Sequence, residues 1–454
     1  MHALAGVGIA LVRYPSTKER KRPMRRGAHL VRDKHVKMAV VLVFMVFLLA
    51  LGSAGLASAG AQEKAPRGVP EAGASGAPPE GAAAGDDPGT QVPEVAVQSW
   101  ALMDAETGLY LNGEDPDEQL PIGSVTKIMT ALVVLEEEPD LDEEVTISDE
   151  AESYVGTVYS NVGLISGERV TVRDLLVATL IPSGTDAAYA LAEHVGGGSV
   201  GNFVEMMNDR ASSLGLENTN FETPAGLDTN ENYSSSRDLA VLTRETLEYP
   251  LFAETVDTAD TTISTQNREI EIATTNQLLG RYPPVTGVKT GTTPQAGANL
   301  VASAEANDES LIAVVIGAED SDERFRAAET ILEYGFSNYD REALVGREEV
   351  YDEAPLPYRP EEFVALAATR DVNGLVDSNS DVERRIIVQE ELPPSASAGE
   401  ELGEVEVLVD GQRVGESPLV AQEGYEEASL WRKASYTVGR FLSSAWESVT
   451  GLFG

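Results

Sequence analysis

The chain has 454 residues, of which 42% are hydrophobic, so it can form more than one domain with a sizeable core. Its formal net charge is −42, and a chain this acidic would repel phosphate backbones, so we expect no nucleic-acid partner. It has no cysteine and only four histidines, which excludes disulfides and cysteine-based zinc sites, and we predict no metal site and no cofactor.

The N-terminal segment has the pattern of an export signal. A basic stretch precedes an apolar run at residues 38–51, and small residues follow it. We interpret residues 1–59 as a signal peptide with cleavage after Ala59 or Ala61, although the long basic stretch leaves the start codon open. The alternative is an uncleaved anchor that spans the membrane. Both interpretations place the body of the protein outside the cytoplasm.

A linker and the first strands follow. Residues 60–95 are rich in Ala, Gly and Pro and predict a disordered linker. The pattern then changes, and residues 97–103 predict a strand. Asp104–Gly108 predicts a turn, and Leu109–Leu111 begins a return strand.

A serine and a lysine lie three residues apart at the start of a predicted helix, within Pro121–Thr130. Residues at i and i+3 share one helix face, so Lys127 can reach the hydroxyl of Ser124. A serine becomes a nucleophile when a base takes its proton, and lysine can be that base if its pKa is lowered. Taken alone, however, this short motif is more often a helix cap beside a solvated lysine.

Lysine is scarce in the body of the protein. Only Lys127, Lys289 and Lys433 follow Lys64. Lysine can lose its proton when it is buried, whereas arginine in practice cannot. Lys127 and Lys289 are therefore candidates for positions where arginine would not serve.

The block at about residues 165–250 is mostly helical in pattern. The predicted helices are Val170–Leu180 with Thr171 as its cap, Ala187–Val195 capped by Asp186, Phe203–Leu214, and Ser235–Tyr249 opened by Ser235 or Ser236. A G-x-S-x-G match at Gly197–Gly201 follows a helix, whereas a nucleophile elbow follows a strand, so we interpret it as a loop.

Strands return after the helical block. Val285–Thr293 predicts a strand that carries the Lys-Thr-Gly triplet, and Asn299–Ala304 and Leu311–Gly317 predict strands of the same sheet. Arg324–Gly335 predicts a closing helix. Strands at both ends of a helical insert predict an α/β sandwich with an α lobe, at residues 96–345.

The C-terminal third differs again. Short strands predict a small β domain at residues 350–421, with Arg384–Val388 and Glu404–Val409 as its clearest strands. Asp410-Gly411 and Gly415 are hairpin signals. Residues 425–454 predict an amphipathic helix that can lie in a membrane interface, and the alternative is a helix docked on a domain.

Three motifs therefore stand in order, and they are Ser124-x-x-Lys127, Ser183-Gly184-Thr185 and Lys289-Thr290-Gly291. This set is typical of β-lactamases and penicillin-binding proteins. With its flanks, the chain resembles the low-molecular-mass penicillin-binding proteins, the D-alanyl-D-alanine carboxypeptidases, over roughly residues 95–421. The resemblance implies a β-lactamase/transpeptidase-like fold, a second all-β domain and a terminal helix used as an anchor.

The resemblance also implies roles for residues. Ser124 is the nucleophile on the terminal D-Ala-D-Ala bond, Lys127 is the general base, and Ser183 relays a proton to the leaving amine. The expected substrate-binding residues are Lys289, Thr290, Gly291, Thr292, Arg237 and Thr185. The implied substrate is the peptidoglycan stem peptide, with β-lactams as inhibitors, at the outer face of the membrane or in the wall.

Two departures from the family pattern leave alternatives open. Thr185 stands where the family usually has asparagine, so one short hydroxyl replaces an amide. Gly317–Asp320 is acidic where relatives often carry a basic residue, and Arg324 is a candidate substitute. The alternatives are a D,D-endopeptidase or weak β-lactamase, and a catalytically impaired cell-wall-binding protein. The absence of E-x-x-L-N after the second motif argues against a class A β-lactamase.

Overall fold

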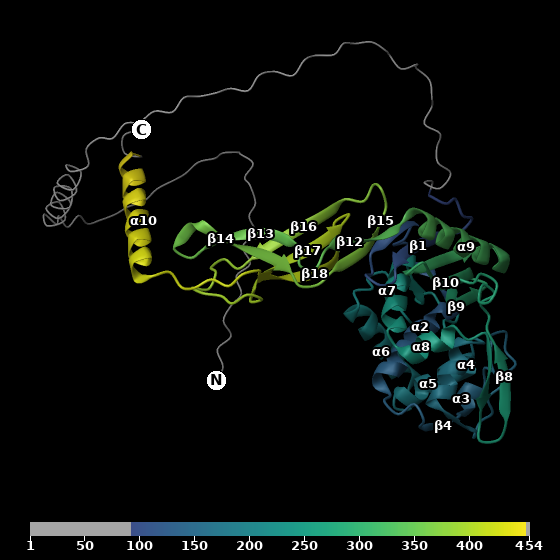
Figure 1. Ribbon diagram of the computed structural model, residues 1–454. Helices are drawn as coiled ribbons and strands as arrows, with labels where there is room; N and C mark the ends of the chain where they lie inside the picture. Colours follow the sequence, from purple (N-terminus) through teal and green to yellow (C-terminus); the bar gives the residue numbers. More distant parts are fainter. Residues whose placement is uncertain (1–91, 451–454) are drawn as a thin grey trace, which may run out of the picture. The chain divides into compact units, whose positions relative to one another are not determined.

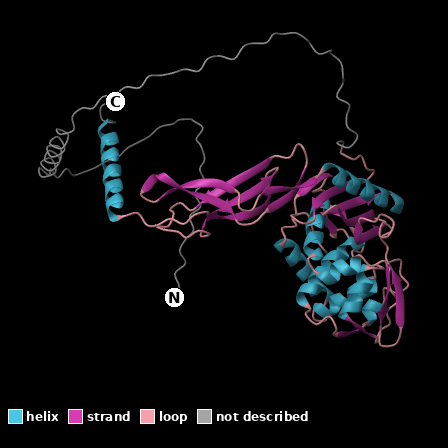
Figure 2. Cartoon of the chain, in the orientation of Figure 1, coloured by secondary structure: helices cyan, strands magenta, loops and turns pink. Residues whose placement is uncertain are grey.

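The computed structural model describes residues 92–450, all within one unit of the chain, Asp86–Gly454 (Figure 1). The predicted signal peptide, residues 1–59, and nearly all of the predicted linker, residues 60–95, lie outside the described residues. A five-stranded sheet with helices comes first, a second five-stranded sheet follows, and a long helix ends the described part (Figure 2). The predicted fold class is confirmed.

The first sheet joins the two ends of the predicted sandwich. Its strand order is β2-β1-β11-β10-β9, and every neighbouring pair is antiparallel. The strands are β1 (Ser99–Asp104), β2 (Tyr110–Glu114), β9 (Val285–Thr293), β10 (Gly297–Ala306) and β11 (Glu309–Ala318). Strand β1 pairs with β11, with Ser99 opposite Ile316, and the sequence between β2 and β9 forms the insert.

Alternate residues of the sheet face two separate cores. Leu300 and Val315 pack in the core that includes α9 (Ser321–Asn338). Val301 and Val314 pack in the core of the α lobe, which includes α7 (Ser236–Leu247). This alternation follows from the two-residue period of a strand and explains why most residues of β10 and β11 are buried.

The α lobe is built from helices and short two-stranded pairs. Its helical elements are η1 (Gly123–Thr126), α2 (Lys127–Glu137), α3 (Asp149–Glu152), α4 (Val172–Leu180), α5 (Thr185–Val195), α6 (Val200–Ser213), α7 (Ser236–Leu247) and α8 (Pro250–Val256). Its pairs are β3 (Leu120–Pro121) with β6 (Tyr233–Ser234), β4 (Glu144–Thr146) with β5 (Arg169–Thr171), and β7 (Asp260–Ser264) with β8 (Glu269–Ala273).

The helix caps confirm part of the sequence analysis and correct part of it. The side chains of Thr171 and Ser235 cap α4 and α7, as predicted. The prediction that Asp186 caps the next helix is wrong, because α5 begins at Thr185 and Asp186 lies in its first turn. Ser199 caps α6, so the loop predicted at the G-x-S-x-G match is confirmed up to Ser199, whereas Val200 and Gly201 lie in the helix.

The β domain follows α9. Its strands are β12 (Asp340–Val345), β13 (Val350–Leu356), β14 (Arg359–Ala368), β15 (Val372–Val376), β16 (Val382–Val388), β17 (Glu401–Val409) and β18 (Gln412–Ala421). Asp410 and Gly411 both have positive φ between β17 and β18, which confirms the predicted hairpin. Gly415 does not form another turn, because it lies within β18 opposite Val407, beside a register shift.

The last described element is α10 (Leu430–Thr450), so the predicted terminal helix is confirmed as a helix. Large apolar side chains on it are exposed, among them Trp431, Val438 and Leu442. Within residues 92–450, no helix has both the length and the apolar character that crossing a membrane requires.

Candidate active site

Ser124 lies in the tight turn η1, which leads directly into α2. Gly123 has a φ of +55°, a conformation that favours glycine, and it makes the sharp change of direction before the serine. Lys127 is the first residue of α2, and its Nζ donates a hydrogen bond to Ser124 Oγ at 2.9 Å. The same amine donates to the carbonyl oxygen of Ala225 at 3.1 Å. The predicted serine–lysine pair is therefore in contact.

The environment of Lys127 makes it a base. Its side chain is fully buried, and burial lowers the pKa of Lys127 to about 7, while the carboxylate of Asp186 acts in the opposite direction. An amine with a pKa near neutrality is about half unprotonated at neutral pH, and that form can accept the hydroxyl proton of Ser124.

Lys289 is a second buried amine beside the first. It lies in β9, and its Nζ donates to the carbonyl oxygen of Thr290 at 3.0 Å. Burial, then the positive charges of Lys127 and Arg324, hold the pKa of Lys289 well below its usual value. Three basic side chains therefore gather in one buried region, a setting that favours an arriving anion.

The third motif packs against the turn that holds Ser124. A Cβ on Gly291 would lie 2.4 Å from the carbonyl oxygen of Ile122, so only glycine allows this approach. A Cβ on Gly123 would lie 3.4 Å from the amide nitrogen of Thr292. The backbones of η1 and β9 are therefore in close contact, and the first and third motifs share one site.

The second motif contributes a buried hydroxyl. Ser183 has a φ of +67° and is 3% exposed, and within the described residues its Oγ has no hydrogen-bond partner. A buried polar atom without a partner is costly, and such atoms are concentrated at functional sites. Thr185 donates its backbone N–H to the carbonyl oxygen of Ser160 at 2.8 Å, which connects this motif to the loop before β5.

The two candidate arginines have different surroundings. Arg237 forms an ion pair with Asp117 at 2.7 Å and stacks over the ring of Tyr110. Arg324 is 5% exposed, and its Nη1 donates to Thr292 Oγ1 at 2.7 Å and to the carbonyl oxygen of Gly291 at 3.2 Å. Burial lowers the pKa of Arg324 to about 10, which still leaves it charged at neutral pH. The arginine that contacts the third motif is Arg324.

The loop Thr223–Leu227 also supports the site, and the sequence analysis did not identify it. Gly226 has a φ of +72°, and a Cβ there would lie 1.8 Å from the carbonyl oxygen of Gly123. The next residue back, Ala225, supplies the carbonyl that accepts from Lys127. The only signal in the sequence is a short Pro-Ala-Gly turn, which by itself predicts no contact.

Comparison with protein families and characterised relatives gives consistent matches. Residues 87–320 match the family model described as D-alanyl-D-alanine carboxypeptidase, and residues 339–427 match the penicillin-binding protein 5 C-terminal domain. The D-alanyl-D-alanine carboxypeptidase DacF of Bacillus subtilis is 32% identical over 361 residues, covering 77% of this chain and 92% of that protein. DacD of Escherichia coli is 33% identical over 362 residues, covering 76% and 91%.

Solved structures give the same picture. Penicillin-binding protein 5 from Haemophilus influenzae is 31% identical with a TM-score of 0.62, covering 74% of this chain and 99% of that one. The Streptomyces K15 DD-transpeptidase is 36% identical with a TM-score of 0.53, covering 54% and 99%.

We predict that Lys127 makes stability depend on pH in a characteristic direction. Its pKa is about 7 in the folded protein and near 10.5 when unfolded, so between these values the unfolded chain binds more protons. Stability should therefore rise with pH, by at most about 1.4 kcal/mol per pH unit from this group. Lys127→Met should reduce that slope, as measured by urea unfolding between pH 7 and 9.

The matched control is Lys433→Met, which removes a lysine paired with Glu427. It should leave the slope unchanged. Equal slopes for Lys127→Met and the unsubstituted protein would contradict the lowered pKa.

Proposed function

The chain belongs to the D-alanyl-D-alanine carboxypeptidase family, whose members are serine hydrolases, and on this premise we propose that Ser124 removes the terminal D-alanine of peptidoglycan stem peptides. The observation that carries this proposal is the 2.9 Å hydrogen bond from buried Lys127 to Ser124 Oγ. β-lactams inhibit by acylating the same serine.

Acylation begins with Ser124. Neutral Lys127 takes the hydroxyl proton as Ser124 Oγ attacks the carbonyl carbon of the D-Ala-D-Ala peptide bond. The developing oxyanion is stabilised by the backbone N–H groups of Ser124 and Thr292, each worth about 3 kcal/mol. The close contact between η1 and β9 supports this assignment, because it brings these two stretches of backbone together.

Collapse of the tetrahedral intermediate expels D-alanine. The leaving nitrogen needs a proton, and Ser183 is the proposed relay because its buried hydroxyl has no partner among the described residues. Water then attacks the acyl-enzyme, and Lys127 accepts a proton from this water. Lys127 returns the proton to Ser124 Oγ as the acyl group leaves, which regenerates the serine. Thr185, two residues after Ser183, is the proposed source of one hydroxyl for positioning substrate.

The terminal carboxylate of the substrate is the anion that this group of basic side chains would bind. Lys289, Thr290 and Arg324 line the strand that would receive it, and an arriving carboxylate would raise the pKa of Lys289. The contacts of Arg324 with Thr292 and Gly291 favour it for this role over Arg237, which is already paired with Asp117.

Two alternatives differ in what happens after acylation. A D,D-endopeptidase or weak β-lactamase would use the same machinery on another substrate. A cell-wall-binding protein without turnover rests on Thr185 alone, and the ordered contact between Lys127 and Ser124 favours the enzyme.

We propose an extracytoplasmic location, because the peptidoglycan substrate lies outside the cytoplasm. Within that location, we propose that α10 docks on the membrane surface. Trp431, Val438 and Leu442 follow one another at i, i+7 and i+11 and are 81%, 58% and 51% exposed. That spacing puts them on one helix face, which suits an interfacial helix.

The principal test follows both the adduct and the product. The chain from residue 60 onward should form a mass adduct with penicillin at Ser124 and release D-alanine from a D-Ala-D-Ala peptide. Ser124→Ala should abolish the adduct and lower release by at least about 10³-fold. Ser213→Ala, at the end of α6, is the control and should behave as the unsubstituted chain.

The absence of any adduct would refute the acyl-transfer assignment. A stable adduct without D-alanine release would instead support the binding protein or a different peptide substrate.

Thr185→Asn tests whether the natural residue limits turnover. The amide adds a donor and an acceptor, so we expect deacylation to accelerate by about tenfold, the equivalent of one hydrogen bond. Thr185→Val, which keeps the shape and removes the hydroxyl, should slow it. Loss of penicillin adduct by mass spectrometry measures both rates, and unchanged rates in both variants would remove Thr185 from the substrate-binding set.

Membrane docking is tested by sedimentation with phosphatidylethanolamine–phosphatidylglycerol vesicles. The chain from residue 60 onward should bind, and a Trp431→Glu, Leu442→Glu double variant should lose at least about tenfold in affinity, because it places charges on the apolar face. Phe363→Glu, an exposed position of β14, is the control. Equal binding of all three proteins would assign membrane contact to another part of the chain.

A further inference from the structure

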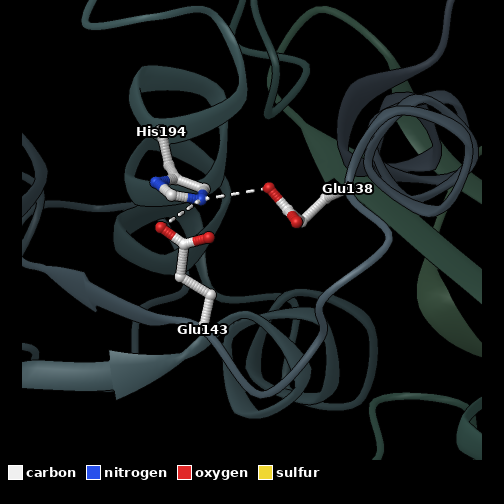
Figure 3. A group of neighbouring side chains, drawn as sticks. All are labelled: Glu138, Glu143 and His194. Carbon is white, nitrogen blue, oxygen red and sulfur yellow. Dashed lines mark ion pairs between the residues drawn. The ribbon is translucent and has the colours of Figure 1, made fainter.

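The side chains of two glutamates that are close in sequence and of one distant histidine converge at the C-terminal ends of two helices (Figure 3). Glu138 is the C-cap residue of α2, His194 lies in the last turn of α5, and Glu143 immediately precedes β4. Their ligand atoms all lie within 4.8 Å of one another. His194 Nε2 is 3.4 Å from Glu138 Oε2 and 3.9 Å from Glu143 Oε1.

The distances from His194 Nε2 to the two glutamate oxygens fit a cation bound between the groups better than direct hydrogen bonds. A charge-assisted N–H···O hydrogen bond measures about 2.7–2.9 Å. Around a tetrahedral cation with bonds of about 2.0–2.1 Å, neighbouring ligand atoms are about 3.3–3.4 Å apart. The spacing between His194 and Glu138 matches the second arrangement, and that between His194 and Glu143 is within a small side-chain movement of it.

The charge around the cluster is unbalanced. Among the described residues, no lysine or arginine forms an ion pair with Glu138 or Glu143. The nearby arginines are engaged elsewhere, because Arg173 pairs with Asp142 and Arg169 with Glu144. The C-terminal ends of two helices add partial negative charge at the same place. One imidazole therefore faces two carboxylates and two negative helix ends.

The backbone holds the carboxylate of Glu138 and the main chain of Glu143 in position. The second oxygen of Glu138, Oε1, accepts from the N–H of Asp140 at 3.0 Å. Glu143 donates its backbone N–H to the carbonyl oxygen of Asp140 at 3.0 Å, and its backbone carbonyl oxygen accepts from the N–H of Val172 at 3.0 Å, so the main chain is fixed at this residue. A secondary hydrogen bond such as the one on the Glu138 carboxylate orients the ligands of metal sites. The side chain of Glu143 is 51% exposed, which leaves a path for an ion and water to enter.

We propose that Glu138, Glu143 and His194 bind a divalent transition-metal cation of the Zn²⁺ type, with water completing its coordination. One imidazole with two carboxylates is a donor set suited to Zn²⁺, and imidazole disfavours Ca²⁺ and Mg²⁺. The sequence analysis predicted no metal site because one histidine forms no ligand motif, whereas the fold brings two distant carboxylates to it.

The site joins the two helices whose opposite ends carry the active-site motifs. Lys127 begins α2 and Thr185 begins α5, each eleven residues long and so about 16 Å from the cluster. A cation bound there would fix the relative position of α2 and α5 without touching the substrate. Its role is structural, and it does not depend on the reaction proposed above.

The test uses the chain from residue 60 onward, in which His194 is the only histidine. After treatment with a chelator, titration calorimetry with Zn²⁺ should show one site per chain, and the single set of imidazole resonances should shift as the site fills. The unfolding midpoint should rise with Zn²⁺ concentration, because the cation binds the folded state. Glu143→Gln and His194→Gln should each weaken binding by at least about tenfold.

The matched control is Glu144→Gln, which makes the same charge change one residue away on a side chain paired with Arg169. It should bind Zn²⁺ as the unsubstituted chain does. No binding by the unsubstituted chain, or equal weakening by Glu144→Gln, would overturn the site and leave only a histidine–carboxylate contact on an acidic surface. Tighter binding of Ca²⁺ than of Zn²⁺ would overturn the assignment to a transition metal.

Discussion

The burial of one amine is the constraint on which the active site depends. Lys127 is fully enclosed, and the loss of solvation keeps its pKa near neutrality. A buried amine still requires hydrogen-bond acceptors, and here these are Ser124 Oγ and the carbonyl of Ala225. The two hydrogen bonds of Lys127 therefore position both the serine turn and the loop before β6. The bond to Ser124 Oγ also prepares the nucleophile.

The position of the third motif depends on the absence of side chains. Strand β9 reaches the serine turn only because Gly291 has no Cβ, and the loop Thr223–Leu227 reaches it only because Gly226 has none. The backbones of η1, β9 and the loop Thr223–Leu227 therefore lie in close contact around Ser124. This arrangement explains how Lys289 and Arg324 come to share a buried region with Lys127, although β9, α9 and α2 are remote in sequence.

The sequence predicted local features well and tertiary partners poorly. The caps of α4 and α7, the hairpin at Asp410-Gly411 and the strand that carries Lys289 all follow from short-range patterns, and these predictions are confirmed. Asp186 was predicted as a cap because of its place before a helix. It instead accepts hydrogen bonds from the loop N–H groups of Val162 and Leu164, a contact that no local pattern encodes.

The same limit applies within the site. Motif spacing allows Ser124 and Lys127 to meet, because i and i+3 share a helix face, but the pairing was predicted only with the other two motifs and their flanks. The contacts of Arg324, by contrast, depend on how α9 packs against the sheet, and the proximity of Glu138 to His194 depends on how α2 packs against α5. Packing of this kind is a property of the whole fold. His194 belongs to no ligand motif of the sequence, so the sequence pattern did not indicate a metal site.

Three glycines pack around Ser124, and they also restrict which substitutions the chain can accept under selection by β-lactams. Any residue other than glycine at 123, 226 or 291 would place its Cβ against neighbouring atoms or in an unfavourable backbone conformation, so these positions offer no route to drug tolerance that preserves hydrolysis. Variation has more freedom in the loop before β5. Val158, two residues before the carbonyl of Ser160 that contacts the second motif, is 94% exposed and can change size or charge without repacking the interior.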